Sequence, residues 1–258
     1  MVREMPDTYM TERLVDTFTS GVGKAEIAVL MPIHNEAETI ENSVIEFYDV
    51  VSPRMSLELV LSEDGSTDDT ENVIERLSEK IPLKAVLSTS RKGYAGGIKD
   101  GLKLVTAEYV LVTDSDGQHD PNDFWKLWDL RTEYDIVSGW RKKRADSLYR
   151  RVMSQVFQWR IKSAFHLPNF LDITAPFKLM KTEVAIEIAE KCKYMSESLW
   201  NEFSVRAHVA GYSIGEIPVS HRIRADKSAT RVYKPWKIPK IAIAQLRAVS
   251  KLKSELNM

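Results

Sequence analysis

The chain has 258 residues, of which 43% are hydrophobic and 28% charged, as in a globular protein with a sizeable core. The net charge of −1 excludes the strong positive field that attracts nucleic acid, so no nucleic-acid partner is expected. The single cysteine, Cys192, excludes an internal disulfide, and we expect a reducing, cytoplasmic setting.

The two ends of the chain differ in composition from its middle. Residues 1–24 are expected to form a polar extension with a short helix, since they lack the apolar core of a secretory signal. Residues 25–234 contain no repeat and no linker, so they are expected to form one domain. Residues 235–258 predict a C-terminal amphipathic helix, and no segment approaches the roughly 18 apolar residues of a membrane span.

Short apolar runs alternate with segments of helical spacing in the first 140 residues. The predicted strands are 27–31, 57–62, 84–90, 109–115 and 134–140, and the predicted helices between them are 39–51, 71–80 and 95–105. The alternation weakens afterwards, where an amphipathic segment, a loop, two helices and a strand are expected at 146–166, 171–180, 182–193, 197–211 and 212–222. This order predicts an α/β fold with a mostly parallel central sheet flanked by helices.

Polar side chains follow the predicted strands. The carboxyl ends of parallel strands meet at one edge of a sheet, where ligands of such folds bind. The residues at these ends are His34, Asn35 and Glu36; Glu63 and Asp64; Arg91 and Lys92; Asp114 and Asp116; and Arg141. The sequence therefore predicts one pocket built from several strand ends.

Asp114 and Asp116 end a strand that reads as buried, although like charges repel and buried carboxylates are costly. A divalent cation with a bound anion would stabilise the pair, and an ordinary turn after the strand is the alternative. Oxygen ligands suit Mg²⁺ or Mn²⁺, and the five histidines lack zinc-ligand spacing.

The segment 141–162 is rich in Arg and Lys, with aromatic residues between them. Its basic side chains fit either a solvated helix face or a phosphate site. Its aromatic residues fit either core packing or a helix lying on a lipid surface.

These motifs, in this order, resemble the family 2 glycosyltransferases of GT-A fold, and among them the dolichol-phosphate mannosyltransferase type of polyprenyl-phosphate glycosyltransferase. The resemblance extends from residue 27 to 233 and rests on MPIHNEAETI, LVLSEDGSTDDT, DSDGQHDP, VSGWR, YRRVMS and GYSIGEIPVSHR. Two segments depart from the family pattern. RADKSA replaces Arg-x-Gly-x-Ser-Lys, and DITAPFKLM stands where many relatives carry Ser-Gly-Phe-Arg.

The resemblance implies an inverting, metal-dependent transfer of a sugar from a GDP- or UDP-sugar to a polyprenyl phosphate. Asp114, Asp116 and Gln118 are the implied ligands of Mg²⁺ or Mn²⁺, with Asp116 also catalytic. The implied donor-binding residues are Pro32, His34, Asn35, Glu36, Asp64, Lys92, Asp114, Ser115 and Arg224.

The acceptor phosphate is expected at Arg141, Arg150 and Ser154, with Arg141 also catalytic. A phosphate needs no general base, whereas a hydroxyl acceptor would need one, for which Glu202 is the candidate. Residues 142–165 and the C-terminal helix, with Leu246 and Val249 on its apolar side, are expected to rest on the cytoplasmic face of a membrane.

Three other functions remain open. The first is a soluble sugar transferase acting on a saccharide or protein hydroxyl. The second is a nucleotidyltransferase, which would favour a glycine-rich loop directly after the first strand that this chain lacks. The third is a non-enzymatic nucleotide-binding module, against which the intact Asp114, Asp116 and Gln118 argue. The sequence indicates no oligomeric state.

Overall fold

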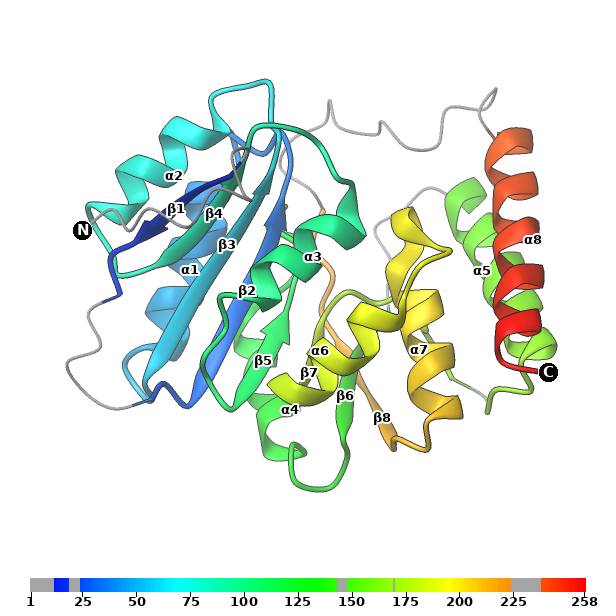
Figure 1. Ribbon diagram of the computed structural model, residues 1–258. Helices are drawn as coiled ribbons and strands as arrows, with labels where there is room; N and C mark the ends of the chain where they lie inside the picture. The colour runs from blue at the N-terminus through cyan, green and yellow to red at the C-terminus, as the bar shows by residue number, and fades with distance from the viewer. Residues whose placement is uncertain (1–11, 19–23, 143–147, 169, 224–237) are drawn as a thin grey trace.

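One mixed sheet of eight strands is the central feature of the computed structural model, which describes residues 12–18, 24–142, 148–168, 170–223 and 238–258 (Figure 1). Its strand order is β1-β4-β3-β2-β5-β7-β6-β8. The strands are β1 (Glu12–Asp16), β2 (Ile27–Ile33), β3 (Leu57–Asp64), β4 (Lys84–Ser88), β5 (Tyr109–Val112), β6 (Ile136–Arg141), β7 (Lys178–Lys181) and β8 (Ile214–Val219).

The middle of the sheet is parallel. β4, β3, β2 and β5 are neighbours with parallel pairing, and every residue of β2 and β3 is buried. Strands covered on both faces read as continuous apolar runs, which is why these segments were recognisable in the sequence. The predicted α/β fold with a mostly parallel sheet is confirmed.

Two strands were not expected. Residues 12–16 form β1, antiparallel to β4, so this part of the N-terminal segment belongs to the sheet and the expected short helix is wrong for it. Residues 178–181, within and just beyond a segment expected to be a loop, form β7, which lies antiparallel between β5 and β6. Both strands are short and carry charged residues, so neither has the apolar run of a central strand.

Helices cover both faces of the sheet (Figure 1). On one face lie α1 (Ile40–Val51), α2 (Thr70–Ser78), the 3-10 turn η2 (Pro121–Asp123) and α4 (Phe124–Asp129). The other face is covered by α3 (Tyr94–Leu102), α6 (Thr182–Lys191), the 3-10 turn η3 (Ser196–Ser198) and α7 (Leu199–Val209). The side chains at 40, 44, 47 and 51 of α1 are all buried, as their helical spacing predicted.

A third packing unit lies beside α7. It pairs α5 (Leu148–Ala164) with α8 (Ile238–Glu255), which run side by side in Figure 1. A separate cluster that includes Ile161, Phe165, Val205, Val249 and Leu252 fills the space between α5, α7 and α8. Val249 is thus a core residue and not part of an outer apolar face. In the part of the chain that the structure describes, no helix has the length and apolarity needed to cross a membrane.

Candidate active site

Residues 113–116 follow β5 at the carboxyl edge of the parallel strands. The amide of Thr113 extends the parallel pairing by donating to the Leu30 carbonyl, at 3.0 Å. The Ser115 hydroxyl donates to the Pro32 carbonyl at 3.1 Å, so these two predicted donor residues join the ends of β5 and β2. The strand ends therefore bring the acidic motif next to the segment His34–Glu36, as the parallel sheet predicted.

The acidic motif turns sharply at Gly117. Its φ of +71° lies in the left-handed region that glycine adopts without steric cost. The Asp116 carboxylate accepts a hydrogen bond from the Gln118 amide at 3.1 Å, which closes the turn. Asp116 itself is buried, with only 9% of its surface exposed. A turn alone gives no reason to bury this carboxylate beside a second one, that of the partly buried Asp114.

The Asp114 carboxylate contacts a tyrosine of α3. The Tyr94 hydroxyl, at the start of α3, donates to Asp114 Oδ1 at 2.8 Å. Burial raises the pKa of Tyr94 well above 10, and the negative charges of Asp114 and Asp116 raise it further. Asp114 therefore contacts the Tyr94 hydroxyl directly, whereas Asp116 acts on it through its charge.

The third predicted metal ligand, Gln118, is held by the segment after β8. Its Nε2 donates to the Arg222 carbonyl at 3.1 Å, and the Arg222 amide donates to the Gln118 carbonyl at 2.7 Å. This orientation leaves the amide oxygen of Gln118 as the atom that a cation could bind.

Two carboxylates and one amide oxygen are the hard ligands that Mg²⁺ and Mn²⁺ prefer. Among the described residues, no group of three or more His, Cys, Asp and Glu side chains could hold a metal alone. In their chemistry, the residues present fit a hard cation.

His119 forms a neutral wall beside this loop. Its Nδ1 lies 3.1 Å from the Thr113 hydroxyl, and its ring stacks on Phe177 with centroids 5.0 Å apart. Burial lowers its pKa well below 6.5, and the charge of Arg141 lowers it further. A buried neutral imidazole adds polarity to the site without adding charge.

The predicted donor residues after β2 are tied to the loop after β3. His34 Nδ1 lies 2.9 Å from the Asp64 carbonyl oxygen, and the Asn35 amide donates to the Ser66 hydroxyl at 2.8 Å. The Glu36 amide donates to the Thr70 hydroxyl at 2.9 Å. The motifs MPIHNEAETI and LVLSEDGSTDDT thus form one connected edge of the site.

Asp64, the predicted donor residue at the end of β3, is hydrogen-bonded to the turn that leads into α3. Its two carboxylate oxygens accept hydrogen bonds from the amides of Lys92 and Gly93, at 2.6 and 2.8 Å. Gly93 has a φ of +84°, so this turn into α3 requires glycine. Asp64 therefore shapes the pocket by holding the turn that carries Tyr94 into place.

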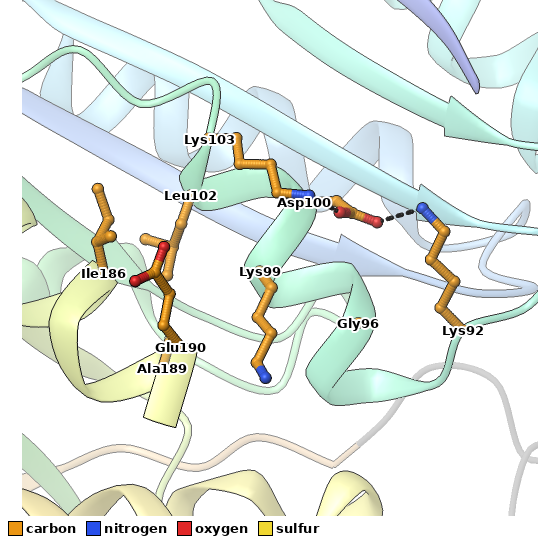
Figure 2. A pocket seen from close by; sticks show the side chains of 9 residues that line it. All are labelled: Lys92, Gly96, Lys99, Asp100, Leu102, Lys103, Ile186, Ala189 and Glu190. Carbon is orange, nitrogen blue, oxygen red and sulfur yellow. Dashed lines mark hydrogen bonds and ion pairs between the residues drawn. The ribbon is translucent and has the colours of Figure 1, made fainter. Parts of the chain in front are cut away.

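The side chain of Lys92, predicted to bind the donor, points elsewhere. Its ammonium pairs with Asp100 at 2.6 Å and with Glu12. It lines a pocket of 290 Å³ between α3 and α6, shown in Figure 2. There Lys103 also pairs with Asp100, and Lys99 donates to the Cys192 carbonyl. The prediction of a donor contact for the Lys92 side chain is corrected, because carboxylates on α3 and β1 hold its charge.

Arg141, at the end of β6, is fixed by a bidentate ion pair. Its Nε and Nη2 donate to the two oxygens of Asp172 at 2.8 and 3.2 Å, and Nη2 also donates to the Thr174 hydroxyl at 2.8 Å. Asp172 is held in turn by Glu216, which accepts from the Asp172 amide. The guanidinium is thus presented in one orientation.

Ser154 is linked to the same loop as Arg141. Gln158 lies one turn further along α5 and donates to the Ser154 hydroxyl at 3.1 Å, while its oxygen accepts from the Ile173 amide. The segment 172–174 therefore joins two of the three predicted phosphate ligands. Arg150 lies in α5 four residues before Ser154, and Arg224 lies outside the described residues.

Glu202 is not placed as a general base. Its carboxylate is fully buried and accepts hydrogen bonds from three successive amides, those of residues 193, 194 and 195. It also pairs with Arg206, one turn along α7, at 2.8 Å. These contacts use the carboxylate to hold the segment before η3, which corrects the role expected for it.

Glu202→Ala is expected to destabilise the fold and to leave the chemistry intact. Removing one partner of a buried ion pair costs about 3–5 kcal/mol, so the melting temperature should fall by roughly 10 °C. Thermal unfolding beside turnover measured well below the transition separates the two effects. Glu187→Ala, which removes an exposed partner of Lys191, is the control. A stable Glu202→Ala protein without turnover would restore the base role.

Lys178 was missed in the sequence, where it lay in an expected loop. It is buried in β7, and its ammonium donates to the Ser138 hydroxyl at 2.6 Å. Its pKa is lowered to about 8, chiefly because the ammonium is buried. The negative charges of Asp172 and Glu216 raise the pKa, and the positive charge of Arg141 lowers it further. A second buried cation thus stands beside the Arg141–Asp172 pair.

Because of Lys178, the free energy of unfolding should depend on pH in the alkaline range. Its pKa rises from about 8 in the fold to 10.5 in the unfolded chain, so between these values the unfolded state binds more protons. The free energy of unfolding should therefore increase with pH across this window, by roughly 3 kcal/mol. Lys178→Met should remove that increase in denaturant titrations at pH 7.5 to 10.5. The exposed Lys181→Met is the control, and an unchanged slope in Lys178→Met would refute the assignment.

The chain is similar in sequence to known glycosyltransferases. The chain is 28% identical over 212 residues to the glycosyltransferase AglD of Haloferax volcanii (78% of this chain, 34% of the relative). It is 28% identical over 159 residues to a dolichol-phosphate mannosyltransferase of Pyrococcus furiosus (58% and 44%). It thus spans less than half the length of these curated relatives.

A mannosyltransferase of Pyrobaculum calidifontis, solved in complex with GDP-Man and Mn²⁺, matches the fold. The TM-score is 0.61 at 20% identity, over 89% of this chain and 65% of that one. The GT-A type of α/β fold expected from the motifs is therefore confirmed. The model of Glycosyl transferase family 2 matches residues 28–188, which contain the acidic motif, Arg141 and Lys178. The chain belongs to Glycosyl transferase family 2.

Proposed function

We propose that this protein transfers a sugar, with inversion, from a nucleotide-diphosphate donor to a polyprenyl phosphate. The observation that carries the proposal is the acidic turn at the carboxyl edge of the parallel strands, in which Asp114 accepts from the Tyr94 hydroxyl and the buried Asp116 accepts from the Gln118 amide. Family membership and the names of the curated relatives support the reaction type and the acceptor class.

The donor diphosphate would lie over the loop 114–118. Asp114, Asp116 and the amide oxygen of Gln118 would hold Mg²⁺ or Mn²⁺, which when bound neutralises the negative charge that develops on the leaving diphosphate. His34, Asn35 and Glu36 would line the nucleotide end, with Asp64 holding the neighbouring turn. The relative from P. calidifontis was solved with Mn²⁺, which supports this cation class.

The acceptor phosphate would lie between Arg141, Arg150 and Ser154. The guanidinium of Arg141 is already oriented by Asp172, which lowers the entropic cost of binding an anion. An ionised phosphate attacks without a general base, and the burial of Glu202 removes the base that the hydroxyl-acceptor alternative relied on.

A lipid acceptor requires access to a membrane surface, which α5 and α8 would provide. Val156 and Trp159 of α5 and Ile243 and Leu246 of α8 are exposed apolar side chains. Arg160 and Arg247 lie beside them and are exposed. This composition is typical of helices that rest on an anionic bilayer, where each basic residue contributes about 1 kcal/mol.

The proposal is tested by product formation from a panel of GDP- and UDP-sugars, each with polyprenyl phosphate or a soluble hydroxyl acceptor. Polyprenyl-phosphate sugar should form only in the presence of Mg²⁺ or Mn²⁺. Flotation with anionic and neutral liposomes should show binding to the anionic ones that is released by salt. Preferential transfer to a hydroxyl, with no liposome binding, would refute the lipid acceptor.

A further inference from the structure

A hydrogen-bonded relay joins the predicted metal carboxylate Asp114 to a helix that none of the sequence motifs contains. Trp200 of α7 donates from Nε1 to the Tyr94 hydroxyl oxygen at 2.9 Å. Tyr94 of α3 then donates to Asp114 Oδ1 at 2.8 Å. The three residues are far apart in the sequence, and only the fold brings them together.

The direction of this relay is fixed by chemistry. An indole nitrogen can only donate, so the Tyr94 oxygen must act as the acceptor for Trp200. A phenol carries a single hydrogen, and in this arrangement that hydrogen is directed to Asp114. The carboxylate therefore receives a hydrogen bond that Trp200 orients through Tyr94.

The Trp200 ring is itself firmly held. It is 4% exposed and packs edge-on against Phe203, with ring centroids 5.3 Å apart. The buried ammonium of Lys178 lies 5.7 Å from its centroid, and Ser138 anchors that ammonium. Contacts from β6, β7 and α7 thus fix the first member of the relay.

We propose that Tyr94 and Trp200 are positioning residues that set the orientation of the Asp114 carboxylate toward the cation of the donor complex. The proposal rests on the proposed metal-dependent function. Groups that orient a metal ligand from behind typically change metal affinity 10- to 100-fold when they are removed. Without the hydroxyl of Tyr94, Asp114 would lose one of the contacts that orient it before a metal binds.

The test is a titration of Mn²⁺ followed by electron paramagnetic resonance, in the presence of GDP or UDP and without sugar transfer. Tyr94→Phe should weaken Mn²⁺ binding about tenfold and change the spectrum of the bound ion. Trp200→Phe should cause a smaller loss. The double variant should bind as weakly as Tyr94→Phe alone, because Trp200 acts through Tyr94.

Tyr212→Phe is the matched control, since it also removes a hydroxyl that donates to a carboxylate, here that of Glu187 at 2.6 Å. It should bind Mn²⁺ like the wild type, and thermal unfolding verifies the fold of each variant. Should Trp200→Phe not fold, Tyr94→Phe alone still decides whether the hydroxyl orients Asp114.

The possible failures are distinguishable. Wild-type affinity and spectrum in Tyr94→Phe would overturn the relay and leave the metal role standing. If the two losses of Mn²⁺ affinity were additive in the double variant, Trp200 would not act through Tyr94, and its positioning role would be overturned. A wild-type protein that binds no Mn²⁺ with either nucleotide would overturn the proposed metal dependence and the relay together.

Discussion

Asp116→Asn is expected to abolish sugar transfer while the protein stays folded. Asparagine keeps an oxygen that can accept from the Gln118 amide, so the turn at Gly117 is preserved and only the charge is lost. Replacing one anionic ligand of a hard cation removes several kcal/mol of stabilisation of the developing charge. A loss of about 4 kcal/mol corresponds to a decrease in kcat/KM of roughly a thousandfold.

A matched control lies four residues away. Asp120 also accepts from the amide two residues ahead, that of Asn122, at 3.0 Å. It faces Arg222 and not Tyr94, so Asp120→Asn should retain most of the activity. Thermal unfolding should show both variants folded. Wild-type turnover in Asp116→Asn, or full turnover of the wild type in excess chelator, would refute the metal role.

The parallel centre of the sheet could be predicted because burial on both faces leaves a simple pattern. β2 and β3 are wholly buried, and their apolar runs end at the polar residues of the site. The edge strand β1 has the sequence ERLVD, and β7 has KLMK. Their charged side chains are stabilised by tertiary contacts, such as the hydrogen bond from Lys178 to Ser138. The spacing of apolar residues along the chain gives no information about such partners.

Only those site residues that follow the ends of strands could be predicted from the sequence. Asp114, Asp116 and Gln118 share one turn, so their proximity follows from the chain itself. Glu202 was misread because three amides before η3 converge on it only in the folded chain. Tyr94 and Trp200 gave no signal, since 106 positions separate them and neither belongs to a known motif.

The most demanding prediction for the acceptor is that Arg141→Lys impairs transfer to polyprenyl phosphate and leaves donor hydrolysis unchanged. Lysine keeps the charge but lacks the planar fork that binds Asp172 with two nitrogens and so fixes the orientation of the cationic group toward a phosphate. One charge-assisted hydrogen bond to the phosphate contributes about 1.5–3 kcal/mol, so kcat/KM for the lipid acceptor should fall roughly ten- to a hundredfold.

The measurement is a comparison of two reactions in the same preparation, lipid-linked product formation and slow hydrolysis of the nucleotide sugar. Arg131→Lys is the control. The guanidinium carbon of Arg131 lies 4.2 Å from the ring centroid of Trp128 in α4, and this substitution should leave both reactions unchanged. If hydrolysis fell in parallel with transfer, Arg141 would act on the donor or on the fold. If transfer to lipid persisted at the wild-type rate, the phosphate would have to bind elsewhere than at Arg141.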